Sequence, residues 1–114
     1  MRRLINKIII EALKPLSIPV SFQRYTGKAK TYITFHEYFT SGEEYEDDFE
    51  FYTGHYIQVD IWSKEDYTDI VKEVKEKLEN VGFKRLNEAD LYEKDTGIYH
   101  KAIRFFYLEE KEES

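Results

Sequence analysis

The fold is decided by the stretch YIQVDIWSKEDYTDIVKEVKEKLENVGF, residues 56–83. Its first part alternates, with Ile57, Val59 and Ile61 on one side, which predicts a strand with one buried face. In its second part apolar residues recur every three or four positions and form the single stripe of an amphipathic helix. The stripe consists of Tyr67, Ile70, Val71, Val74, Leu78 and Val81. The stretch therefore predicts a strand, a tight corner and a helix that lies on a sheet.

Both ends of this helix carry sequence signals. Ser63 is a candidate N-cap, because its hydroxyl can accept a hydrogen bond from the first turn. Asp66, three residues later, gives a capping-box spacing. Gly82 suits the left-handed position that follows a helix. We therefore expect the helix to cover residues 63–81.

The rest of the chain extends this unit to the order α-β-β-β-α-β-β. A first amphipathic helix is expected over residues 2–14, bracketed by Pro15 and Pro19. The expected strands cover residues 20–25, 31–39, 51–62, 83–93 and 98–108, with Gly97 in the last hairpin turn. This order predicts an α+β fold, a mostly antiparallel curved sheet with two helices packed on one face. We expect one domain over residues 1–114, with residues 109–114 as a frayed tail.

Composition narrows the classes of function. The 114 residues include 17 basic and 23 acidic side chains, a net charge of −6, which argues against a protein built mainly to grip phosphates. Aromatic residues make up 17%, which favours a sheet with large cross-strand contacts, and the absence of cysteine excludes disulfides and thiolate chemistry. We identify no signal peptide and no apolar run near the ~18 residues that span a bilayer.

Residues 41–50 carry an acidic cluster. Its six carboxylates are Glu43, Glu44, Glu46, Asp47, Asp48 and Glu50. We expect a solvated loop or the tip of a long hairpin. Two alternatives are a divalent-cation site, although the spacing of a calcium loop is absent, and an acidic channel wall that repels a DNA backbone.

The second face of the sheet is expected to be aromatic. Alternation assigns to it Tyr32, Tyr38, Tyr56, Trp62, Tyr99, Phe105 and Tyr107. Such a face is too apolar for water and indicates a partner surface, such as a neighbouring copy of the chain. The alternative is that half of these rings belong to the core and the others are scattered surface tyrosines.

No catalytic constellation stands out. His36, His55 and His100 lie on three expected strands and could converge with Asp60 or Glu37 as a metal or acid–base site. Half-buried histidines of ordinary strands are the alternative. The sequence has no HExxH, nucleophile elbow, P-loop or GxGxxG motif, and the basic residues near Tyr25 are only a weak nucleic-acid signal.

Four segments carry a resemblance to a known family. They are VSFQRY (20–25), YITFHEY (32–38), YIQVDIWSKEDY (56–67) and LYEKDTGIYHKAIRFFY (91–107). Over about residues 15–108 the chain resembles the small tail-completion and tail-terminator proteins of tailed bacteriophages and prophages. The blocks QVDIWSK (58–64) and YHxxxRF (99–105) are the most specific parts.

The resemblance implies a structural protein of the virion tail, present in the host cytoplasm during assembly, with no catalytic activity and no cofactor. It implies a ring of copies, as in the hexamers of that family, that caps the tail tube and joins it to the head-completion or connector protein. It implies no membrane, and DNA that passes through without specific binding. Candidate contacts with these partners are Glu43, Glu44, Tyr45, Glu46, Asp47, Asp48, Tyr56 and Trp62. Another head–tail connector or minor capsid component, or a small metal-dependent enzyme using the histidines, are the alternatives.

Overall fold

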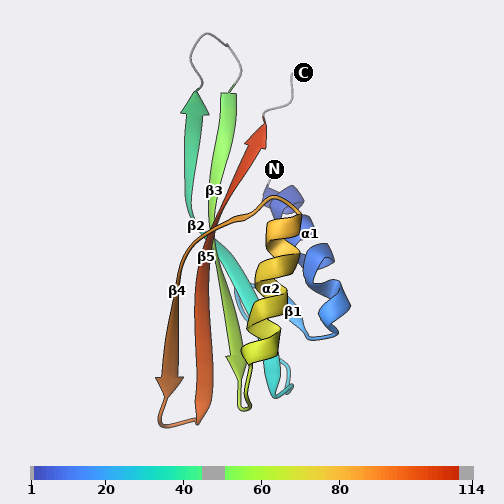
Figure 1. The fold of residues 1–114 in the computed structure, drawn as a ribbon, viewed down its shortest axis with the longest axis vertical. Coiled ribbons are helices and arrows are strands. Elements are labelled where there is room, and N and C mark those ends of the chain that lie inside the picture. The colour runs from blue at the N-terminus through green and yellow to red at the C-terminus, as the bar shows by residue number, and fades with distance from the viewer. Residues whose placement is uncertain (1, 45–50, 111–114) are drawn as a thin grey trace.

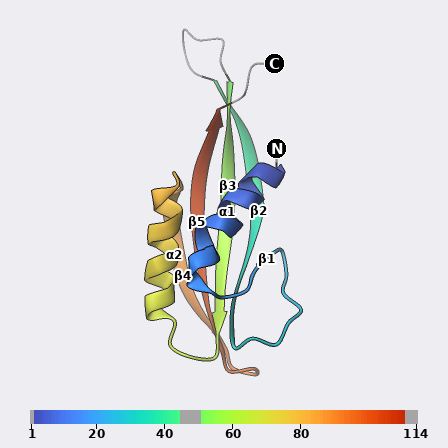
Figure 2. The same cartoon turned by 90° about the vertical axis from the view of Figure 1, so that its right-hand side faces the viewer.

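The computed structural model describes residues 2–44 and 51–110, in which two helices cover one face of a five-stranded sheet (Figures 1 and 2). The strand order is β1-β2-β3-β5-β4; β1 runs parallel to β2, and the other neighbours are antiparallel. The predicted α+β architecture and element order are confirmed. The elements are α1 (Arg2–Leu13), the 3-10 turn η1 (Lys14–Leu16), β1 (Val20–Phe22), β2 (Thr31–Glu44), β3 (Phe51–Ser63), α2 (Thr68–Asn80), β4 (Lys84–Glu93) and β5 (Ile98–Glu110).

The core lies between the helices and one face of the sheet. Helix α1 contributes a stripe at four-residue spacing, and α2 contributes the stripe expected from its periodicity. The central strand β3 supplies alternate residues, which all point toward the helices. The buried apolar residues are Ile5, Ile9, Leu13, Ile33, Phe35, Ile57, Val59, Ile61, Val71, Val74, Leu78, Phe83, Ile103 and Phe105.

Helix α2 starts later than expected, and the assignment of Ser63 as its N-cap is wrong. Ser63 still belongs to β3, where it pairs with Thr31 on one side and Tyr99 on the other. Its hydroxyl hydrogen-bonds the Thr31 hydroxyl at 2.8 Å and accepts from the Glu65 amide at 3.0 Å, so it closes the corner. Pairing with two neighbouring strands outweighs the local capping signal.

The C-terminal end of α2 agrees with its sequence signal. Gly82 has φ +103°, the left-handed conformation predicted for it. The Phe83 amide donates to the Leu78 carbonyl at 3.0 Å, and the Gly82 amide donates to the Glu79 carbonyl at 3.1 Å. These two bonds form a Schellman motif, which turns the chain from α2 into β4.

The β2–β3 hairpin is longer than expected. Strand β2 continues to Glu44 and β3 begins at Phe51, so residues 41–44 of the segment expected as a solvated loop or the tip of a long hairpin are strand. Strand β5 likewise continues to Glu110, and Glu109 is buried, so these two residues are not part of a frayed tail. The described residues measure 52 × 23 × 22 Å, and the ends of β2, β3 and β5 extend beyond the helices as a narrow arm (Figure 1).

Strand β1 is shorter than expected. It ends at Phe22, and Gln23 takes a positive φ of 68° while its amide donates to the Phe35 carbonyl at 2.8 Å. The chain then leaves the sheet, so β1 covers only the first part of the β2 edge. No helix among the described residues is both long and apolar enough to cross a membrane.

Candidate functional site

The candidate site is the sheet face that the helices leave open, called here the uncovered face. Strand register places on it every second residue of the three central strands, because opposite residues of an antiparallel pair share a face. Within the described part of the chain, no helix or strand packs over this face, since both helices lie on the other side of the sheet (Figure 1). Its side chains are Tyr32, Thr34, His36, Tyr56, Gln58, Asp60, Trp62, His100, Ala102, Arg104 and Phe106.

One end of the uncovered face is a stack of rings. The Tyr25 and Tyr32 centroids lie 4.5 Å apart, and those of Tyr32 and Trp62 lie 6.1 Å apart. Trp62 lies almost parallel to His100, with centroids 3.8 Å apart and planes 12° apart. The indole N–H of Trp62 donates to the Thr34 hydroxyl at 3.0 Å. The stack is therefore held in place before any partner binds, which lowers the entropy cost of binding.

The middle of the uncovered face is polar and centred on Asp60, which is only 5% exposed. Its Oδ1 lies 2.6 Å from His100 Nε2 and accepts from the Gln58 amide at 2.9 Å. Its Oδ2 lies 4.0 Å from His36 Nδ1. The carboxylate thus fixes the orientation of His100 and, through it, of the ring stack.

The other end of the uncovered face is a second aromatic group at the base of the arm. A β-bulge between Glu37 and Phe39 places Phe39 directly across from Tyr56, so that both side chains lie on the uncovered face. Tyr56 contacts Phe39 and Phe106, with centroids 5.3 and 5.0 Å away. Phe39 is more than half exposed, so this end offers apolar surface to a partner.

The prediction of an aromatic second face is correct for some of the seven residues that alternation assigned to it. Tyr32, Tyr56 and Trp62 lie on the uncovered face, and so does Tyr38, whose ring contacts Tyr56 and Arg104. Phe105, however, is fully buried beneath the helices, and Tyr107 packs against the same core. Tyr99 also faces the helix side, where its ring contacts Tyr67. The prediction failed in β5 because three consecutive aromatic residues, 105–107, hide the alternation of buried and exposed positions. The pairing of Phe105 with Ile57 determines which of them face the helices.

The three histidines do not converge. His36 and His100 flank Asp60 on the uncovered face, whereas His55 lies on the opposite face of the sheet. Within residues 2–44 and 51–110, no group of three or more histidine or carboxylate side chains is arranged to hold a metal ion. The alternative of a histidine-based metal site finds no support in this part of the chain.

His55 instead forms a buried cluster with two glutamates at the base of the arm. Its Nδ1 lies 2.7 Å from Glu37 Oε2, its Nε2 lies 2.8 Å from Glu109 Oε1, and the residue is 3% exposed. The Thr40 hydroxyl also donates to Glu37. The cluster joins β2, β3 and β5. No local pattern predicted the contact with Glu109, because residues 109–114 were expected to form a tail.

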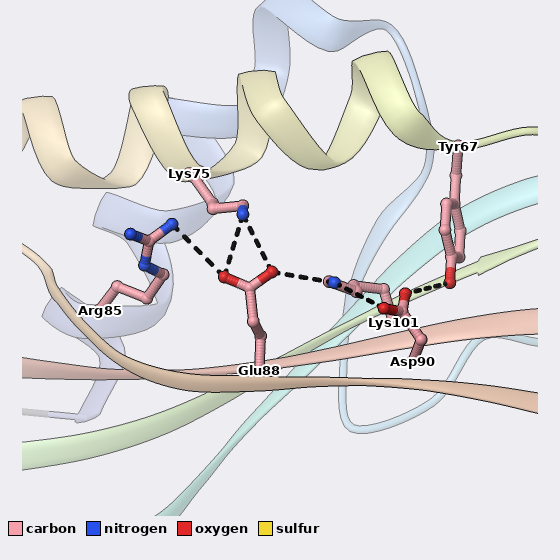
Figure 3. A network of polar contacts seen from close by, with 6 residues as sticks. All are labelled: Tyr67, Lys75, Arg85, Glu88, Asp90 and Lys101. Carbon is pink, nitrogen blue, oxygen red and sulfur yellow. Dashed lines mark hydrogen bonds and ion pairs between the residues drawn. The ribbon is translucent and has the colours of Figure 1, made fainter.

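A second network holds α2 against the edge of the sheet (Figure 3). The Glu88 carboxylate on β4 accepts from Lys75 of α2 at 2.9 Å, and its Oε1 lies 2.9 Å from Lys101 Nζ on β5. Arg85 Nη1 lies 3.4 Å from Glu88 Oε2. The hydrogen bonds from Lys101 and then Lys75 lower the pKa of Glu88 to about 2.

The same network continues to Asp90. The Tyr67 hydroxyl donates to Asp90 Oδ1 at 2.8 Å, and Lys101 donates to Oδ2 at 3.1 Å. Burial and the bond to Asp90 raise the pKa of Tyr67 to about 12, and the bonds from Tyr67 and Lys101 lower the pKa of Asp90. Burial opposes the charge of Lys101, but its bonds to Glu88 and Asp90 outweigh this and raise its pKa.

The Glu88 network predicts a specific loss of stability in acid. The pKa of Glu88 falls from its usual 4.5 to about 2, so the folded protein binds fewer protons than the unfolded chain between these values. The contribution of Glu88 is complete above about pH 4.5 and is lost as the pH falls toward about 2. Allowing for partial solvation, we expect about 1–2 kcal/mol.

The measurement compares urea unfolding of the wild type and Glu88→Gln at several pH values. The stability gap between the two proteins should be largest above about pH 5 and should shrink toward about pH 2.5. Glu73→Gln, at an exposed position on α2, serves as the control and should show no such trend. A gap that stays constant over this range would contradict the assignment.

The other candidate contacts are only partly described by the structure. Glu43 and Glu44 are the last residues of β2. Tyr45, Glu46, Asp47 and Asp48 fall outside the described residues. Of the candidate contacts, Tyr56 and Trp62 are brought onto the uncovered face, at its opposite ends.

Comparisons with known proteins find a similar fold among solved structures. No protein-family model matches the chain, and no curated protein matches it. Among solved structures, it is similar to a chain in the structure titled "Virion of native gene transfer agent (GTA) particle". The similarity has a TM-score of 0.58 at 11% sequence identity, and it covers 90% of this chain and 84% of the other. At this identity the similarity is one of fold.

Proposed function

We propose that the chain is a structural subunit of a phage-like virion, and more specifically a tail-terminator subunit that forms a ring on the end of the tail tube. The observation that carries the proposal is the fold shared with a chain of the gene transfer agent virion over 90% of this chain. The sequence resemblance to tail-completion proteins over about residues 15–108 supports the same assignment.

The uncovered face supplies the contact surface that such a subunit requires. It carries two aromatic groups around a polar centre, and aromatic residues with a few buried polar groups are typical of interface cores. A ring needs a contact between two different surfaces of neighbouring copies. In the proposed ring, the uncovered face meets a neighbouring copy or the tail tube, with Tyr56 and Trp62 at its two ends.

In the proposed ring, the arm extends each subunit beyond its helices. Strands β2, β3 and β5 carry the acidic hairpin end, which includes Glu43 and Glu44, away from the helices (Figure 1). In the proposed ring, the acidic residues between 43 and 48 contact a neighbour or face the lumen. There they would repel the DNA backbone that passes through. The proposed role is mechanical and requires no catalytic residue and no cofactor.

The test uses the major tail-tube protein encoded in the same genome as this chain. Purified tubes are grown with and without this protein, and their ends are examined by negative-stain electron microscopy. We expect ring-shaped caps and an arrest of tube growth. Tubes that continue to grow with bare ends at every protein concentration would overturn the terminator role. Binding to the head connector alone would identify a different head–tail joining component.

Substitutions on the uncovered face test which surface the assembly uses. Trp62→Ala and Tyr56→Ala should each weaken tube capping by at least about tenfold, because buried aromatic anchors dominate interface energies. The measurement is the protein concentration that caps half of the tube ends. Lys72→Ala, exposed on α2, is the matched control and should cap as well as the wild type. Circular dichroism identifies any variant that fails to fold, and normal capping by both folded variants would exclude this face.

A further inference from the structure

Strand β4 forms one free edge of the sheet. It is the last strand in the order β1-β2-β3-β5-β4, and it pairs only with β5 among the described strands (Figure 1). Its ten residues contain no proline, and three apolar side chains are well exposed: Leu86 at 42%, Leu91 at 51% and Tyr92 at 53%. An edge of this length with exposed apolar residues is a template for another strand.

The charges of β4 are ordered along the strand. Basic side chains, Lys84 and Arg85, stand at its beginning, and an acidic side chain, Glu93, stands at its end. When two copies of a strand pair antiparallel, the beginning of each lies against the end of the other. The order of charge in β4 is therefore complementary to itself, whereas an unrelated strand would have to supply the same reversed order.

We propose that β4 pairs antiparallel with β4 of a second copy of this chain, around a two-fold axis at Ala89. In this register Lys84 of each copy lies opposite Glu93 of the other. The β-bulge at Leu86 makes this fit possible, because Arg85 and Leu86 together then oppose a single residue, Tyr92 of the second copy. The bulge also keeps residues of the same face opposite one another on both sides of it.

Position 89 suits the axis of such a pair. Ala89 is exposed, and its small side chain lets two strands approach at the point where each residue meets its own copy. Glu88 lies opposite Asp90 of the second copy, but Lys75 and Lys101 already compensate these carboxylates within each subunit. The pairing joins two five-stranded sheets into one and makes the two uncovered faces continuous.

This contact differs from the ring contact proposed above. An isologous pair closes at two copies, whereas a ring repeats a contact between unlike surfaces. Trp62→Ala, which changes the uncovered face, should therefore leave the β4 pair intact. The two proposals can fail separately.

A cysteine at the axis tests the register. The chain has no cysteine, so Ala89→Cys introduces a single thiol. Opposite residues of an antiparallel pair have Cα atoms about 4.5–5.5 Å apart, which lies within the range that a disulfide bridges. We expect mild oxidation to convert most of the protein into a covalent dimer of two 13.8-kDa chains. Lys72→Cys, on the exposed side of α2, is the control, and equal or slower crosslinking at position 89 would overturn the proposal.

A charge exchange tests the partner contact without a crosslink. Lys84→Glu and Glu93→Lys each place like charges opposite one another at two points of the pair, whereas the double variant restores opposite charges. By analytical ultracentrifugation at low salt, each single variant should raise the dimer dissociation constant at least about tenfold, and the double variant should return it to near the wild-type value. Lys72→Glu controls for the change in net charge. A monomeric wild type, or a double variant no better than the single ones, would refute the β4 pair.

Discussion

Phe105→Ala is expected to lower the free energy of unfolding by about 3–5 kcal/mol, the usual cost of deleting a buried phenylalanine ring. Phe105 is fully buried, pairs with Ile57 on the central strand and contacts the Phe83 ring edge-on at 6.2 Å. Its removal leaves a cavity between the sheet and the helices, where backbone pairing on both sides of β5 limits collapse. Urea unfolding followed by Trp62 fluorescence measures the loss.

The adjacent phenylalanine provides the matched control. Phe106 points to the uncovered face and is only partly buried beside Tyr56. We expect Phe106→Ala to cost about 1 kcal/mol, several times less than Phe105→Ala, because most of its lost surface is already near solvent. If Phe106→Ala lowered the free energy of unfolding more than Phe105→Ala did, the face assignment of β5 would be wrong.

His55→Leu is expected to cost about 3 kcal/mol at neutral pH. The histidine bonds Glu37 through one ring nitrogen and Glu109 through the other, so its loss leaves two enclosed carboxylates without this donor. Leaving a buried polar group without its hydrogen-bond partner costs more than replacing both partners by apolar groups. The loss should appear as a lower urea midpoint with an unchanged slope.

Two variants separate this explanation from simple repacking. The triple variant Glu37→Leu, His55→Leu, Glu109→Leu should recover most of the lost stability, because it removes the carboxylates together with their partner. His36→Leu, on the uncovered face and 4.0 Å from Asp60, should change stability by less than about 1 kcal/mol. A triple variant as unstable as His55→Leu would show that the carboxyl groups left without their partner are not the cause.

Local sequence signals were sufficient to predict the element order and most element boundaries. The stripe on α2 and the alternation of β3 were read correctly because the residues that create each pattern lie within a few positions of one another. The positive φ of Gly82 was predictable for the same reason, since a Schellman motif depends on one turn of chain. The uncovered positions of Tyr56 and Trp62 followed from alternation with the buried residues of β3.

Where the prediction failed, contacts between distant segments decided the outcome. Ser63 stayed in the sheet because Thr31 and Tyr99 pair with it, although its local surroundings favour a helix cap. Glu109 became part of a buried cluster because β5 continues along β3 as far as His55. Neither partner is near in the sequence, so no local pattern records the contact.

The amino-acid order by itself thus determined that this protein is an α+β domain with one helix-covered sheet face, because side-chain periodicity fixes each helix and strand where it forms. Only the tertiary structure decided which residues of β5 face the helices, on which face of the sheet each histidine lies and which strand forms a free edge. These features depend on strand register, and register is set by pairing between segments far apart in the sequence, such as Trp62 with His100, 38 residues later, and Gln58 with Arg104, 46 residues later.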